Sequence, residues 1–184
     1  IKKLTLPKSL VKLNDLWCQG AEYLKEVDVD EENPYFSSID GILIYEHKEI
    51  KEILFVSKSF KGTFTIPIGT TRIGNYAFSN IEYLTSIESS LQNSNQNENI
   101  ISSTISLSSF CFSNLPNLCK IKLAGKEINI LNDCIINCKD LKEITFINSS
   151  NVIMYEKFCN DTNNLRSISF LDVKNVNKYI IRAT

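Results

Sequence analysis

The chain has 184 residues and a formal net charge of −1, with 20 Lys and Arg against 21 Asp and Glu. A nearly neutral chain has no overall field to attract nucleic acid or an anionic membrane surface, so neither partner is expected. No apolar run approaches the roughly 18 residues that a spanning helix needs, so we expect no membrane insertion within this chain.

The N-terminal residues predict two short strands of a repeat array. Apolar residues at 4–7 and at 24–29 have the spacing of strands that recur later in the chain. Trp17 occupies a repeat position that holds a small residue in later repeats. We expect it to fill the end of the array rather than to bind a ligand.

An insertion over residues 33–64 interrupts this array. The pair Asp40-Gly41 is typical of a tight turn, and apolar residues alternate over 42–45 and again over 53–56. These patterns predict an inserted β-hairpin, followed by a polar connection over 57–62.

The clearest repeat unit is residues 66–87, which read IPIGTTRIGNYAFSNIEYLTSI. Its apolar positions fit neither a helix period nor a strand period throughout, so the segment must turn corners between short elements. The unit recurs at roughly 23-residue spacing, which lies in the range of leucine-rich arrays. Gly74 is expected to allow a close or left-handed passage of the backbone.

The chain after this unit combines a polar tract with three further repeats. Residues 89–103 are rich in Asn and Ser and bury too little to fold alone, so we expect a mobile loop. The repeat returns over 107–123, 130–146 and 154–170. An apolar segment over 173–181 follows without a polar cap, so we expect the chain to be a piece of a longer array.

These repeats predict an α/β fold in a single domain over residues 1–184. We expect a right-handed leucine-rich-repeat solenoid with one parallel sheet, and short helical or 3-10 turns on the opposite side. Phe78, Phe112 and Ile135 should lie in one buried row. No single coil, meaning one turn of the array, can bury its apolar side chains alone.

Most of the six cysteines fall on buried positions of the repeat, which favours free thiols that pack as small apolar groups. Cys111 and Cys134 would lie in adjacent coils, so a disulfide between them is geometrically feasible. A metal site at Cys134, Cys138 and Cys159 is the other alternative. The single histidine is far away in sequence and does not support zinc, so we expect no metal and no cofactor.

The repeat resembles the BspA-type leucine-rich repeat, also called the Treponema-pallidum-type repeat. Residues 66–87 match its pattern I-P-x-x-x-x-x-I-G-x-x-A-F-x-x-C-x-x-L-x-x-I almost throughout, with Ile81 at the cysteine position. Residues 33–45, NPYFSSIDGILIY, are similar to the N-P-x-F-x-S-x-D-G-V-L-Y insertion of many members. The resemblance implies a non-catalytic protein-binding or adhesive module on a cell surface or in a secreted protein.

The residues themselves agree with a non-enzymatic function, because the chain has one histidine and neither a G-x-x-x-x-G-K nor a G-x-S-x-G motif. The alternative is an intracellular, cytoplasmic scaffold in which the array is a structural strut. Free buried thiols favour that alternative.

The outward residues of the predicted sheet are the candidate binding face. Charges of both signs alternate along it, which favours a protein or glycan ligand over a polyanion. The candidate residues are Lys3, Thr5, Glu26, Asp28, Ser86, Glu88, Lys120, Lys122, Glu143, Thr145, Ser167 and Ser169.

Overall fold

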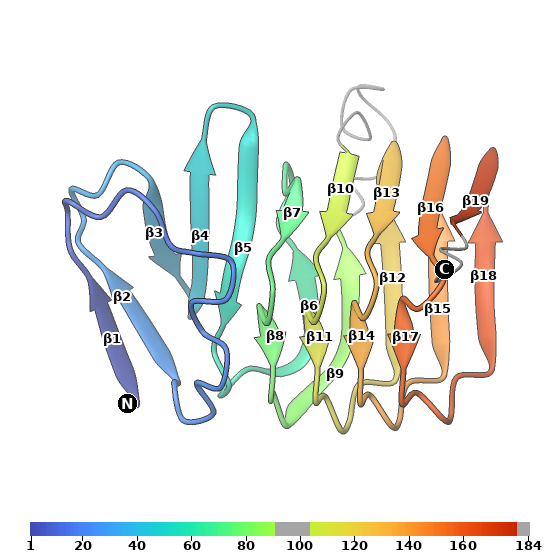
Figure 1. Cartoon of the computed structure of the whole chain (residues 1–184), viewed down its shortest axis with the longest axis horizontal. Coiled ribbons are helices and arrows are strands. Elements are labelled where there is room, and N and C mark those ends of the chain that lie inside the picture. Colours follow the sequence, from blue (N-terminus) through green and yellow to red (C-terminus); the bar gives the residue numbers. More distant parts are fainter. Residues whose placement is uncertain (91–103, 180–184) are drawn as a thin grey trace, which may run out of the picture.

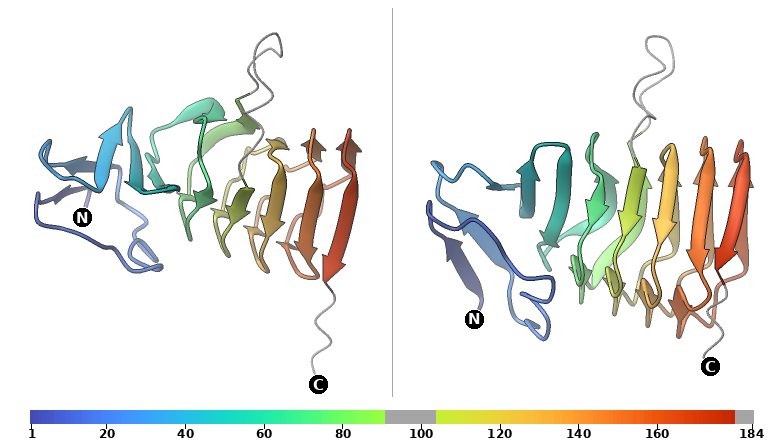
Figure 2. Two further views of the ribbon diagram at one scale, coloured as in Figure 1. Left: turned by 90° about the horizontal axis from the view of Figure 1, so that it is seen from above. Right: turned by 45° about the horizontal axis from the view of Figure 1, so that its top comes forward.

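A computed structural model of the chain describes residues 1–90 and 104–179. Its strands lie side by side along one long axis, with β1 (Lys3–Leu6) at one end and β18 (Ser167–Leu171) at the other (Figures 1 and 2). Most of the Asn- and Ser-rich tract expected to form a loop, and the last apolar residues of the chain, lie outside the described residues.

The repeats build three sheets instead of the single parallel sheet that we expected. The five-stranded sheet has the order β18-β15-β12-β9-β6 and the four-stranded sheet the order β17-β14-β11-β8. The third sheet has eight strands in the order β19-β16-β13-β10-β7-β5-β4-β3, and β1 pairs with β2 (Glu26–Val29) separately. From β7 to β18 each coil passes once through each sheet, for example along β10, β11 and β12, and all pairs between coils are parallel.

The strands of the five-stranded sheet are β6 (Lys61–Ile66), β9 (Tyr83–Ser89), β12 (Lys120–Ala124), β15 (Glu143–Ile147) and β18. Those of the four-stranded sheet are β8 (Phe78–Ser79), β11 (Phe112–Ser113), β14 (Ile135–Ile136) and β17 (Cys159–Asn160). The eight-stranded sheet contains β3 (Phe36–Ile39), β4 (Ile42–His47), β5 (Ile50–Val56), β7 (Arg72–Ile73), β10 (Thr104–Leu107), β13 (Glu127–Ile130), β16 (Asn151–Tyr155) and β19 (Asn175–Tyr179).

The expected helical turns are absent from residues 1–90 and 104–179, and the two-residue strands of the four-stranded sheet take their place. The amides there donate to the next coil instead of along their own coil: Phe78 N to Cys111 O is 2.9 Å, and Phe112 N to Cys134 O is 3.0 Å. Left-handed residues such as Asn80 (φ 56°) follow each short strand. A residue in this conformation cannot continue a right-handed helix, so the chain turns a corner.

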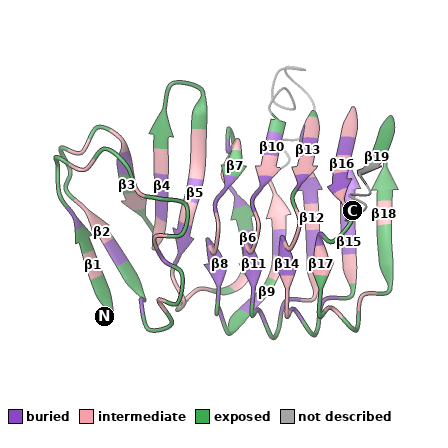
Figure 3. Ribbon diagram, in the orientation of Figure 1, coloured by how far each residue is buried: buried purple, intermediate pink, exposed green. Residues whose placement is uncertain are grey.

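The expected row of buried side chains is confirmed. Phe112 pairs in register with Phe78 on one side and with Ile135 on the other. The exposed fractions of the two phenylalanines are 0%. Their ring centroids lie 5.4 Å apart, and the ring of Phe64, which belongs to β6 of the five-stranded sheet, packs against Phe78 at 4.7 Å. Figure 3 shows the buried residues along the strands in the middle of the array.

The insertion is a three-stranded antiparallel unit, where we expected a two-stranded hairpin. The strands β4 and β5 form the predicted hairpin, and β3 adds to it through a tight turn at Asp40 and Gly41, both with positive φ. β5 then pairs in parallel with β7 through Ile53 and Ile73, so the insertion extends the eight-stranded sheet. Its N-terminal side belongs to a second apolar cluster, where Trp17 packs edge-on against Phe55 at 6.2 Å.

Gly74 lies where the array meets the insertion, and a close backbone approach is confirmed there. A Cβ atom at this position would lie 2.9 Å from the Glu52 Oε1 atom and 3.3 Å from the Ile53 carbonyl oxygen. We expect Gly74→Val to reduce the free energy of unfolding by about 1–3 kcal/mol, because this side chain overpacks the junction. Urea titration measures the loss.

The control is Leu131→Val, which changes the corresponding position of a later coil. Leu131 is 37% exposed, so its replacement should change the free energy of unfolding by less than about 0.5 kcal/mol. An equal stability of the Gly74→Val variant and the wild-type chain would show that the junction yields to the larger side chain.

Candidate functional site

The outer surface of the five-stranded sheet presents two in-register rows of polar side chains. We call these ten residues the polar face. One row is Thr63, Ser86, Lys120, Glu143 and Ser167, and the other is Thr65, Glu88, Lys122, Thr145 and Ser169. The rows arise because side chains along a strand point alternately to its two faces. On β12, Lys120 and Lys122 therefore point outward, and Ile121 and Leu123 are buried.

Neighbouring members of the rows contact one another. The Ser86 hydroxyl donates to Thr63 Oγ1 at 2.8 Å, and the Thr145 hydroxyl donates to Glu143 Oε1 at 3.1 Å. Lys120 Nζ lies 4.0 Å from Glu143 Oε2. Thr145 is only 4% exposed, so it orients Glu143 and offers little surface to a partner.

Eight of the twelve expected face residues lie on the polar face, and the other four do not. Lys3, Thr5, Glu26 and Asp28 belong to the separate β1–β2 sheet, because the insertion intervenes between this sheet and the five-stranded one. Lys3 Nζ is already paired, at 3.1 Å from Glu26 Oε1 and 2.6 Å from Asp28 Oδ2. Hydrogen bonds to Asp28 and then to Glu26 raise the pKa of Lys3. The four residues therefore do not share a sheet with the other eight.

Two of the three threonines of the polar face, Thr63 and Thr65, were not predicted from the sequence. Thr63 and Thr65 flank the buried Phe64, and this alternation was the available signal. Residues 61–64 of β6 fall within the range predicted for the insertion, so the sequence predicts the end of this strand but not its start.

A groove, which we call the side groove, lies on the outer face of the eight-stranded sheet. Arg72, Ser106, Asn129 and Ile153 occupy one in-register row across it. The groove has a volume of about 560 Å³ and is lined by Ile50, Thr71, Arg72, Ser106, Ser108, Asn129, Leu131, Ile153 and Tyr155. Arg72, Ser106, Asn129 and Ile153 fall on an unspecified position of the repeat pattern, and Ser108, Leu131 and Tyr155 replace its glycine, so the available signal was their alternation with buried residues.

Charge in the side groove is partly neutralised. Arg72 Nε lies 3.8 Å from Glu52 Oε1. Burial raises the pKa of Glu52, and the positive charge of Arg72 opposes that rise. The remaining lining residues are uncharged, so the groove suits neutral polar groups better than ions.

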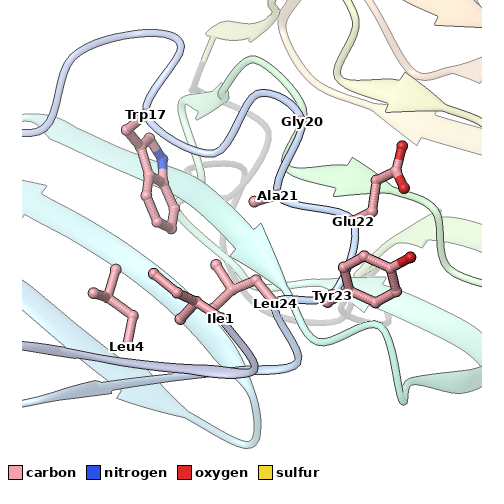
Figure 4. A pocket seen from close by; sticks show the side chains of 8 residues that line it. All are labelled: Ile1, Leu4, Trp17, Gly20, Ala21, Glu22, Tyr23 and Leu24. Carbon is pink, nitrogen blue, oxygen red and sulfur yellow. The ribbon is translucent and has the colours of Figure 1, made fainter.

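An apolar pocket of about 260 Å³ lies at the N-terminal end of the array (Figure 4). Its lining residues are Ile1, Leu4, Trp17, Gly20, Ala21, Glu22, Tyr23 and Leu24. The Glu22 carboxylate points away from the apolar side chains in this view. The Trp17 indole nitrogen is buried without a hydrogen-bond partner. Trp17 packs on Phe55 and also lines this pocket, so its role as a filler of the array end stays a prediction.

Groups that could support metal or acid–base chemistry are dispersed. Within residues 1–90 and 104–179, no three His, Cys, Asp or Glu side chains gather in a way that could hold a metal ion. His47 instead packs edge-on against the Tyr35 ring at 5.3 Å. All six cysteines are free thiols in this structure.

The described part of the chain contains no helix of the length and hydrophobicity that crossing a membrane requires.

Residues 48–184 match the profile of the BspA type leucine rich repeat region, in six copies. The chain belongs to the BspA-type leucine-rich repeat family. The resemblance inferred from residues 66–87 is thus confirmed. No curated protein sequence gives a significant match to this BspA-type chain.

Solved structures of three bacterial proteins share the fold of these BspA-type repeats. A leucine-rich repeat protein from Eubacterium ventriosum is 19% identical with a TM-score of 0.63, over 92% of this chain and 49% of its own. A leucine rich cell surface protein from Faecalibacterium prausnitzii is 14% identical with a TM-score of 0.55, and the match covers 99% of this chain and 49% of that protein. The pneumococcal vaccine antigen PcpA is 17% identical with a TM-score of 0.56, and the match covers 100% of this chain and 56% of that protein. The chain spans about half the length of these proteins.

Proposed function

We propose that this chain is a non-catalytic recognition module of a cell-surface protein and binds a host or matrix protein through the polar face. BspA-type repeats form a scaffold in which each coil adds one strand to a continuous surface. One similar structure is described as a cell surface protein and another as a vaccine antigen. These descriptions support the surface location.

The observation that carries the proposal is the pair of in-register polar rows across five strands. Opposite charges adjoin between coils, with Glu88 beside Lys122 and Lys120 beside Glu143. A surface of mixed sign favours a partner with a complementary mixed pattern, which is the usual property of a protein surface. A single-sign polyanion would meet repulsion from the two glutamates. A glycan read by the same hydroxyl and charged groups is the other outcome of the binding test.

Charge reversal at Lys120 and Lys122 tests the polar face. We expect Lys120→Glu with Lys122→Glu to weaken retention of matrix proteins on the immobilised chain about tenfold, or ~1.4 kcal/mol, because four neighbouring carboxylates then repel acidic groups of the partner. Surface plasmon resonance with a soluble extracellular-matrix extract measures the change, and circular dichroism checks the fold.

The matched control reverses two lysines outside the polar face, Lys139→Glu and Lys157→Glu. Both are exposed, so this variant carries the same change in net charge. If the control loses binding as strongly as the test variant, net charge and not the polar face governs retention. If neither loses binding, the polar face is not the binding site.

An intracellular structural scaffold is the second candidate, and the six free thiols favour it. Alkylation of the protein from its own cells, in denaturant and without reductant, separates the two functions. Six labelled cysteines support a reducing interior, whereas protected pairs support the surface location.

A further inference from the structure

We propose that Cys111 and Cys134 form an oxidisable thiol pair, whose disulfide links one repeat coil covalently to the next. The two Sγ atoms lie 3.3 Å apart, and both side chains have exposed fractions of 0%. The two residues are 23 positions apart and therefore occupy the same place in consecutive coils. This inference does not depend on the proposed binding function.

The backbone holds the two coils in register on both sides of the pair. Phe110 N donates to Asp133 O at 2.7 Å, and Phe112 N donates to Cys134 O at 3.0 Å. Adjacent strands lie about 4.8 Å apart, which is within the Cα separation of roughly 4.4–6.8 Å that a disulfide requires. The 3.3 Å between the two sulfurs has to shorten only to the disulfide bond length of about 2.05 Å.

The other cysteines are directed to different partners. Cys138 Sγ lies 3.6 Å from the Phe112 carbonyl oxygen, and Cys18 Sγ lies 3.8 Å from that of Asn75. Cys119 Sγ lies 3.4 Å from the Asn117 carbonyl oxygen. Cys134 Sγ has Cys111 Sγ at 3.3 Å, so this pairing is favoured over one with Cys138.

The reaction is a thiol–disulfide exchange with a low-molecular-weight disulfide such as oxidised glutathione. One protein thiolate attacks a sulfur of the oxidant, forms a mixed disulfide and releases one glutathione thiolate. The second protein thiolate then displaces the second glutathione, so two protein thiols are oxidised and one glutathione disulfide is reduced to two thiols. Two protons pass to the solvent and the released thiolates.

Burial determines when this exchange takes place. It raises the pKa of Cys134, so the folded chain presents very little thiolate at neutral pH and no access for the oxidant. The disulfide therefore forms while the coils dock during folding, and the folded reduced protein oxidises slowly.

Refolding in a defined redox buffer tests the proposal. The full chain is reduced, unfolded, and refolded either with reduced and oxidised glutathione or with reduced glutathione alone. Alkylation in denaturant, intact mass and peptide mapping then report the thiols. We expect the first sample to lose two thiols, to contain a peptide that joins Cys111 to Cys134, and to melt about 10 °C higher than the second. Six free thiols, or a different linked pair, would overturn the proposal.

Single substitutions identify the two sulfurs independently. Cys111→Ala and Cys134→Ala should each abolish the linkage, and alanine suits this position because Ala77 precedes Phe78 at the same place of an earlier coil. Cys119→Ala should leave the linkage intact. If the Cys111→Ala chain still loses two thiols during refolding, the pair is wrongly assigned. Peptide mapping of the wild-type chain decides the matter even if a variant folds poorly.

Discussion

Replacing Phe78 by alanine is expected to lower the free energy of unfolding by about 3–5 kcal/mol. The side chain is fully buried and lies between the Phe64 and Phe112 rings, at 4.7 and 5.4 Å between centroids. Each coil is stabilised mainly by its neighbours, so a cavity here weakens two interfaces together. Because domains are stable by only about 5–15 kcal/mol, this loss should be visible in a urea titration followed by circular dichroism.

Phe170→Ala is the matched control for this prediction. Phe170 stacks on Phe146 at 5.4 Å between centroids but is 37% exposed on the last coil. The same substitution should lower the free energy of unfolding by less than about 1.5 kcal/mol there, because a partly exposed side chain buries less apolar area on folding. Equal losses at the two positions would contradict the claim that burial between two coils sets the stability.

Replacing Leu43 by alanine is expected to lower the free energy of unfolding by about 2–5 kcal/mol, chiefly that of the second apolar cluster at the N-terminal end of the chain. Leu43 is fully buried and pairs with Phe55, and both belong to a cluster separate from the one that contains Phe78. Trp17 is the single tryptophan and packs on Phe55, so its fluorescence reports on this cluster alone. We expect the fluorescence transition to shift further than the circular dichroism transition.

Leu16→Ala provides the control, because Leu16 is 48% exposed near the same cluster and should shift neither transition by more than about 0.5 kcal/mol. Coincident transitions in the Leu43→Ala chain would show a single cooperative unit. The coupling would then run through β5, whose Ile53 packs in the cluster of Phe78 and whose Phe55 packs in the N-terminal one.

The buried side of the fold was predictable because it repeats in the sequence. Phe78, Phe112 and Ile135 recur at one position of the pattern, and parallel stacking of coils places such residues in one row. The turn at Asp40 and Gly41 was predictable for a similar reason, since two adjacent residues of positive φ favour this pair.

The corners of the coils were not predictable from apolar spacing. Asn80, Asn114 and Asn137 adopt φ values of 56°, 53° and 52°, and each ends a two-residue strand where we expected a helical turn. Asparagine tolerates this conformation better than most residues, but it is also abundant in loops, so its presence did not distinguish a corner from a helix end.

The candidate site was predicted only in part, because outward residues carry no repeated pattern. Lys120 and Lys122 were found by counting outward from the buried residues of β12, whereas the side groove lies on a second sheet that a one-sheet prediction does not contain. Lys3 and Glu26 follow the same counting rule, but the insertion places their sheet elsewhere.

The in-register pairing of β6, β9, β12, β15 and β18 makes the array a molecular ruler. A ligand chain that crosses these strands would meet a new side chain about every 4.8 Å. Each added coil lengthens the sheet by one strand and leaves this spacing unchanged. The outward residue differs from coil to coil, as Glu88 and its neighbour Lys122 show, while the buried rows keep the strand spacing constant. Recognition can therefore diversify by outward substitution at little cost to the scaffold.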